Sequence, residues 1–205
     1  MYRIVKLRSD HVVDFAAEEL KKYLRMMMPE CGEVDICLAP EAREGFRLGL
    51  LQDFGLPNEA EDPVLDDIIH IDTTAQGGIL AGSNPRSVLF AVYRYLKLNG
   101  CRWLFPGVDG EMIPIKEVEG VKYHKLADSR YRGYCNEGAE SQQAMLETIE
   151  FVPKIGLNTY MIEFDIPKIY YDWYYTHKSN ETNWEPEPVS AETVLQWKRV
   201  CETEM

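Results

Sequence analysis

The chain has 205 residues, of which 45% are hydrophobic and 27% charged, and its formal net charge is −12. This composition is typical of a globular protein and excludes a largely disordered one. The negative charge disfavours nucleic-acid binding and docking on anionic membranes, whereas a neutral partner such as a sugar is compatible with it. No apolar stretch approaches the ~20 residues that a membrane-spanning helix needs.

The N-terminus and the cysteines indicate a cytoplasmic protein. Residues 1–10 contain neither the apolar run nor the small-residue cleavage site of a signal peptide. The cysteines are odd in number, scattered, and never in a C-x-x-C pair, so we expect reduced thiols: Cys31, Cys37, Cys101, Cys135 and Cys201. None has the spacing of zinc ligands, and we predict no metal and no cofactor.

The first half of the chain begins with a predicted strand and a long helix. Residues 3–8 alternate between apolar and polar side chains, as a half-buried strand does. Ser9 or Asp10 is suited to cap a helix whose apolar positions recur every three or four residues, at Val13, Ala16, Ala17, Leu20, Leu24 and Met27. Three short apolar runs then predict strands at 34–38, 46–51 and 68–73, with a surface loop over 53–67.

A second helix follows a glycine-rich strand. Residues 77–83 predict the strand, Asn84 the helix N-cap and Pro85 its first position. The glycines lack the G-x-G-x-x-G spacing of a dinucleotide site, so we expect them to permit a tight turn and a close approach of helix to sheet. Because strands and helices do not alternate regularly, residues 1–125 predict an α/β (α+β) domain, a mixed sheet with two long helices packed on it.

The segment after Asp128 has a different order of predicted elements, in which strands and a helix alternate. Residues 131–135 predict a strand, 142–155 a helix and 159–164 a second strand, with short connections. This strand–helix–strand order is the repeating unit of a (β/α)8 barrel, which needs eight such units and ~200 or more residues. With a further helix predicted after Ser190, residues 126–205 are interpreted as the start of an incomplete barrel in the N-terminal portion of a longer enzyme.

Three segments in this order carry a family resemblance: AAEELKKYL at 16–24, GGILAGSNPRSVLFAVYRYL at 77–96, and GCRWLFPGVDGE at 100–111. They resemble the N-terminal domain of α-glucuronidases, a module that also precedes the barrel in β-N-acetylhexosaminidases and α-N-acetylglucosaminidases. The resemblance covers most of residues 1–165. It implies a hexosaminidase-like, non-catalytic domain, then a (β/α)8 barrel, in an enzyme that hydrolyses glycosidic bonds.

The resemblance also implies one substrate contact. The pair Arg132-Gly133, with GLNTYMIEF at 156–164, looks like the start of a hexosaminidase-type barrel. In that family the arginine of this pair contacts the sugar at the non-reducing end, so Arg132 becomes a substrate-binding candidate. The aspartate that usually follows this pair is not evident, and Cys135-Asn136-Glu137 stands in its place. This difference leaves the identity of the sugar open. The strand carrying the general acid would lie beyond Met205, and so the catalytic residues are expected there.

Carboxylates and aromatic residues supply the other candidates. Glycosidases use two carboxyl groups ~5 to 9.5 Å apart, and four carboxylates follow the two predicted barrel strands: Glu137, Glu140, Glu163 and Asp165. They show no matched acid/base pair, so Glu137 and Glu163 are predicted as substrate-binding, the alternative being solvated loop carboxylates. The aromatic side chains of Tyr134, Tyr160, Trp173 and residues 170–175 are suited to stack on sugar rings, or to pack in a core. Trp103 is expected to pack in the core or between domains.

Two other function classes stay open beside the leading hypothesis of a glycoside hydrolase fragment that is itself inactive. One is a free-standing carbohydrate-binding or protein-interaction module that uses the aromatic patch at 170–173. The other is a zinc-peptidase-like enzyme, disfavoured because H-E-x-x-H is absent. The four histidines, His11, His70, His124 and His177, are interpreted as isolated. Expected partners are a carbohydrate substrate and a second copy of the chain, a homodimer formed through the exposed partial-barrel surface.

Overall fold

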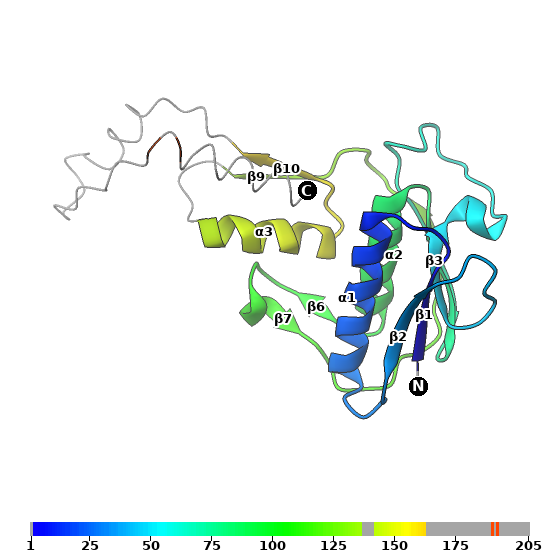
Figure 1. Cartoon of the computed structure of the whole chain (residues 1–205). Helices are drawn as coiled ribbons and strands as arrows, with labels where there is room; N and C mark the ends of the chain where they lie inside the picture. The colour runs from blue at the N-terminus through cyan, green and yellow to red at the C-terminus, as the bar shows by residue number, and fades with distance from the viewer. Residues whose placement is uncertain (1, 137–141, 163–189, 191, 193–205) are drawn as a thin grey trace, which may run out of the picture.

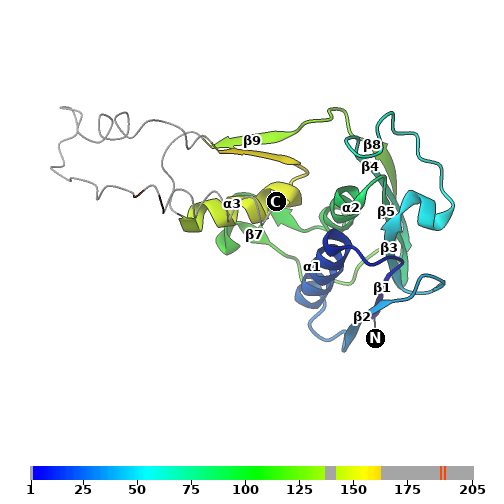
Figure 2. The ribbon, with the colours of Figure 1, turned by 45° about the horizontal axis from the view of Figure 1, so that its top comes forward.

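The computed structural model describes residues 2–136, 142–162, 190 and 192. Its centre is a six-stranded mixed sheet in the order β2–β1–β3–β5–β4–β8 (Figure 1, and with all six strands labelled in Figure 2). The strands are β1 (Tyr2–Lys6), β2 (Val34–Leu38), β3 (Phe46–Leu50), β4 (Ile68–Thr74), β5 (Gly77–Gly82) and β8 (Lys122–Leu126). The pairs β1–β2, β1–β3 and β3–β5 are parallel, whereas β4 runs antiparallel to β5 and β8. The predicted mixed sheet is confirmed.

Two long helices, α1 (His11–Met27) and α2 (Pro85–Leu98), cover one face of this sheet (Figure 1). The Asp10 carboxylate caps α1 by accepting hydrogen bonds from the amides of Val12 and Val13 at 2.9 and 3.2 Å. The Asn84 side chain caps α2 by accepting from the Ser87 amide at 2.9 Å. These hydrogen bonds confirm both predicted N-caps. Short polar side chains are favoured at this position because they satisfy amides that the first turn leaves without partners.

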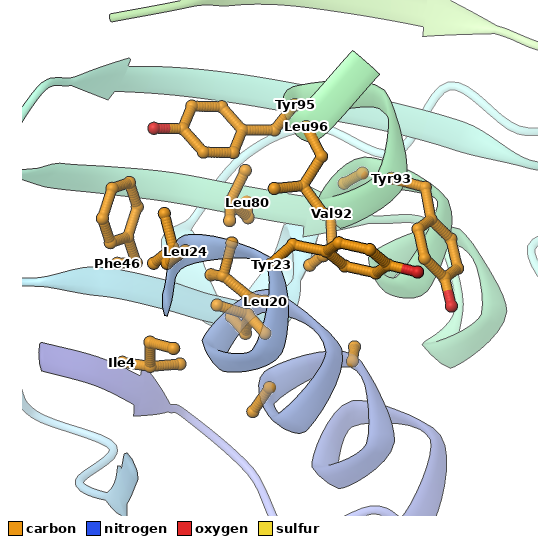
Figure 3. Close-up of a cluster of buried hydrophobic side chains, with 14 of the residues drawn as sticks. Ile4, Leu20, Tyr23, Leu24, Phe46, Leu80, Val92, Tyr93, Tyr95 and Leu96 are labelled. Carbon is orange, nitrogen blue, oxygen red and sulfur yellow. The ribbon is translucent and has the colours of Figure 1, made fainter. Parts of the chain in front are cut away.

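The main hydrophobic core lies between the two helices and the sheet (Figure 3). Ile4, Phe46 and Leu80 point from the sheet toward Leu20 and Leu24 of α1 and toward α2, and all five side chains are fully buried. Trp103 also belongs to this core, where its ring makes edge-to-face contacts with two tyrosine rings. The predicted packing role of Trp103 is therefore confirmed.

Glycines let the β4–β5 hairpin turn and let α2 approach the sheet closely. Gly77 and Gly78 begin β5 with φ angles of +146° and +140°, a region that other residues rarely adopt. A Cβ atom on Gly82 would lie 2.5 Å from the backbone carbon of Ser87 in the first turn of α2. The expected roles of these glycines are confirmed.

Several short elements were absent from the sequence-based prediction. Residues Leu51–Phe54 form the 3₁₀ turn η1, which spans the last residue of the predicted strand 46–51 and the start of the predicted loop 53–67. The strands β6 (Arg102–Trp103) and β7 (Glu111–Met112) form a small antiparallel pair around the 3₁₀ turn η2 (Val108–Gly110). The edge strand β8 was also missed, because its residues are mostly exposed and show no apolar alternation.

A second unit follows, consisting of β9 (Gly133–Asn136), α3 (Gln142–Lys154) and β10 (Thr159–Ile162). The two strands pair in parallel, with Gly133 opposite Thr159. This confirms the predicted strand–helix–strand order, although the described residues show no barrel. The unit lies on the side of α1 and α2 away from the sheet (Figure 1 and Figure 2). Most of the helix predicted after Ser190 lies outside the described residues.

Candidate functional site at the junction of the two units

One buried carboxylate, that of Asp67, connects the sheet domain to the β9–α3–β10 unit. Its Oδ2 atom accepts hydrogen bonds from Arg132 at 2.7 Å and from the Asn158 amide at 3.1 Å. Its Oδ1 atom accepts from Arg86 at 2.9 Å and from the Ser87 hydroxyl at 2.8 Å. The side chain is 1% exposed. Asp67, the residue directly before β4, thus links the sheet to the first turn of α2 and to the residues directly before β9 and β10.

The charge state of Asp67 follows from these partners. Burial opposes ionisation of the carboxyl group, but hydrogen bonds from Arg132, Ser87 and Arg86 outweigh burial and hold its pKa below the ordinary value. A carboxylate that accepts several hydrogen bonds and faces two guanidinium groups is stabilised in its charged form. The junction is therefore an ionic one at neutral pH.

Arg132, the substrate-binding candidate, is tied into this junction. Its Nη2 atom donates to Asp67, its Nε atom to the Gly156 carbonyl at 2.8 Å, and its Nη1 atom to the Ser129 carbonyl at 2.7 Å. The guanidinium carbon lies 5.4 Å from the centre of the Phe90 ring, and the side chain is 20% exposed. Arg132 therefore positions the start of β9, and its contact with a sugar stays a prediction from the resemblance.

A second polar contact joins the two units at Lys154, the last residue of α3. The Oε1 atom of Glu111 accepts hydrogen bonds from Lys154 at 2.8 Å and from the Tyr23 hydroxyl at 2.6 Å. Glu111 and Lys154 are each 9% exposed. Burial would raise the pKa of Glu111, but Lys154 and Tyr23 lower it overall, whereas burial and Glu111 raise the pKa of Tyr23.

The other predicted site residues are only partly described. Tyr134 lies on β9, is 36% exposed, and its ring stacks on that of Tyr160 at a centroid distance of 5.8 Å. Tyr160 itself is buried in the small core beside α3, so core packing is its role here. Six candidates or candidate ranges lie outside the described residues: Glu137, Glu140, Glu163, Asp165, Trp173 and the tyrosines of 170–175.

The structure brings together two histidines that the sequence-based interpretation treated as isolated, and that interpretation was wrong. His70 on β4 and His124 on β8 are direct partners across the antiparallel pair, and their Nδ1 atoms lie 3.1 Å apart. Burial and, secondarily, His124 lower the pKa of His70. The sequence showed no signal because the two residues are distant in the chain and β8 was not predicted. In the part of the chain that the structure describes, no three His, Cys, Asp or Glu side chains form a metal-binding group.

Comparison with known proteins leaves the family resemblance without independent support. A scan against protein-family models finds no match to this chain, and a search of curated proteins finds no relative. Among the described residues no helix is both long enough and apolar enough to cross a membrane.

Proposed function

We propose that the chain is the N-terminal portion of a glycoside hydrolase, in which a non-catalytic domain supports the first strands of a catalytic (β/α)8 barrel. The observation that carries the proposal is the junction at Asp67. One buried carboxylate of the sheet domain is hydrogen-bonded by Arg132, directly before β9, and by Asn158, directly before β10. Such a link sets the position of both parallel strands relative to the accessory domain.

The exposure of the β9–β10 pair supports a larger parallel sheet. Parallel strands normally occur in sheets whose two faces are both covered. Here Tyr134 and Met161 on these strands remain 36% and 52% exposed, and among the described residues the unit buries a core of four hydrophobic side chains. Further strands and helices of a barrel would cover these surfaces and complete the unit.

The proposal assigns separate roles to the two units. The carboxylates that act as acid and base are assigned to barrel strands after residue 205, and so the 205-residue chain alone is expected to show no turnover. A cytoplasmic location is part of the proposal, and it rests on the scattered cysteines of the sequence. A neutral glycoside is the substrate class that suits the net charge of −12.

The first experiment is the intact mass of the natural gene product in its source cell, followed by a hydrolysis assay of that product on a panel of nitrophenyl glycosides. We expect a product several hundred residues long that hydrolyses at least one glycoside. Turnover by the 205-residue chain alone, lost in Glu137→Gln or Glu163→Gln, would contradict the assignment of catalysis to later strands.

A free-standing carbohydrate-binding module is the second candidate, favoured by the exposure of Tyr131, two residues before β9, and of Tyr134 on β9, at 69% and 36%. Exposed aromatic rings offer flat apolar surfaces to sugars. Calorimetric titration of the 205-residue chain with mono- and oligosaccharides separates the candidates. Binding that is lost in Tyr131→Ala and Tyr134→Ala, with no hydrolysis by the natural product, would favour the module over the enzyme.

A further inference from the structure

The face of the sheet that α1 and α2 do not cover carries a pair of histidines. On β4 and β8, Ile71 and Tyr123 are paired in register and both pack on the helix-side core. Because side chains alternate between the faces of a sheet, the adjacent register pair, His70 and His124, lies on the opposite face. His124 is exposed and His70 is partly buried.

The pair has the separation of two ligands on one metal ion. The Nδ1 atoms are 3.1 Å apart, and a tetrahedral ion with ligands at ~2.0 to 2.1 Å places neighbouring nitrogens about 3.4 Å apart. Without metal, one neutral ring donates its Nδ1–H to the Nδ1 lone pair of the other. With both protons on the Nε2 atoms instead, both Nδ1 lone pairs become available to an ion without any change in net charge.

One carboxylate lies further along the same face of the sheet, beyond the histidine pair. Asp72 lies two residues from His70 on the same face, and its carboxylate contacts Lys122 of β8 at 3.7 Å. Lys122 is 84% exposed, so this ion pair is weak and leaves the carboxylate accessible. On the other side the facing pair is Ile68 and Leu126, which offers no ligand.

We propose that His70 and His124 form a two-histidine binding site for a divalent transition-metal ion of the nickel, copper and zinc group, with water filling further positions. Imidazole nitrogen is a preferred ligand of these ions. Bound there, the ion ties the edge strand β8 to β4. The site is independent of the proposed glycosidase function, since it lies on the sheet face away from the β9–α3–β10 unit.

The test is calorimetric titration of the purified chain with Ni²⁺ and with Zn²⁺, using the variants His124→Gln and His70→Gln. We expect one ion per chain, and binding weaker by on the order of 100-fold in either variant, since losing one of two ligands removes the benefit of effective concentration. The double variant His11→Gln/His177→Gln is the matched control, because it removes two histidines and keeps the pair. It should bind as the unmodified chain does.

Two further measurements distinguish metal binding at the histidine pair from a folding defect in the variants and from non-specific binding elsewhere on the surface. Ni²⁺ should raise the melting temperature of the unmodified chain and of the control, but not of His124→Gln, whose metal-free melting temperature should be unchanged. In NMR spectra, Cu²⁺ should broaden the ring signals of His70 and His124 before that of His11. Equal affinity in His124→Gln and the unmodified chain, or loss of binding in the control, would overturn the proposal.

Discussion

The sheet domain and the β9–α3–β10 unit are stabilised in different ways. The sheet domain buries an extensive core between α1, α2 and one face of the sheet, in which Leu20, Tyr93 and Phe46 are among the fully or almost fully buried side chains (Figure 3). In the described part of the smaller unit, four hydrophobic side chains are buried in a core of its own: Met145, Ile149, Val152 and Tyr160. Hydrophobic burial scales with area removed from water, so the first region has much the larger source of stability.

The smaller unit instead depends on polar links to the larger one. The carboxylates of Asp67 and Glu111, both on the sheet-domain side, accept hydrogen bonds from Arg132 and Lys154. Buried ionic contacts of this kind set relative position more than they add free energy, but removal of one partner is costly. The first unit can therefore fold by its core, whereas the second is positioned by specific side chains.

The largest effect is expected from a cavity in the sheet-domain core. Leu20→Ala removes a fully buried side chain from α1, and we expect a loss of about 3 kcal/mol in the free energy of unfolding. Urea unfolding followed by circular dichroism measures it. Met26→Ala on the same helix is the control, because Met26 is 42% exposed and should change stability little. Equal losses in both variants would show that the core does not dominate.

A smaller loss is expected at the junction itself. Asp67→Asn leaves Arg132 and Arg86 without their carboxylate, and we expect a loss of about 2 kcal/mol, the order of a charged hydrogen bond. Hydrogen exchange should show the increase in opening chiefly at β9 and β10. Asp66→Asn is the matched control, since the neighbouring Asp66 pairs with Arg130 closer to the surface and should have less effect. Uniform acceleration across the sheet domain would contradict a local role.

The effect of Asp67→Asn should depend on pH. The pKa of Asp67 is lower in the folded chain than in the unfolded one, so its ionic contribution is complete above the unfolded value of about 3.9. The contribution is lost as pH falls from there through the lower folded pKa, because the unfolded state then binds the proton first. The stability difference between the unmodified chain and Asp67→Asn should therefore shrink between about pH 5 and pH 2. A constant difference over that range would exclude an ionised Asp67 as its cause.

The smallest effect is expected at the second polar link. Lys154→Met removes the ammonium group from Glu111 while the Tyr23 hydroxyl still donates to it, and we expect a loss of about 1 kcal/mol. Amide exchange in α3 should accelerate roughly fivefold, while that in α1 stays unchanged. Lys125→Met breaks an exposed pair with Asp128 and should leave α3 unaffected. Faster exchange in α1 as well would mean that the link stabilises the whole core.

Local patterns were sufficient to predict much of the fold. The spacing of apolar residues identified α1, α2 and α3, and Asp10 and Asn84 marked two helix starts, because caps and amphipathic periods are properties of a short segment. The strand–helix–strand order after Asp128 was predictable for the same reason. The predicted bounds differ from the observed ones by a few residues, as at β1, where strand ends depend on pairing with neighbours.

Contacts between segments far apart in the chain could not be predicted from the sequence. The edge strand β8 has no apolar alternation and is a strand only because β4 offers it hydrogen bonds. The pairing of His70 with His124 follows from that register. Likewise, Asp67 lay in a segment predicted as a loop, and nothing local indicated that Arg132 and Asn158 would meet its carboxylate. By itself the sequence determined which segments form helices and most strands, since those preferences act over a few residues. Only the tertiary structure decided which polar side chains face one another, because that depends on contacts between segments far apart in the chain.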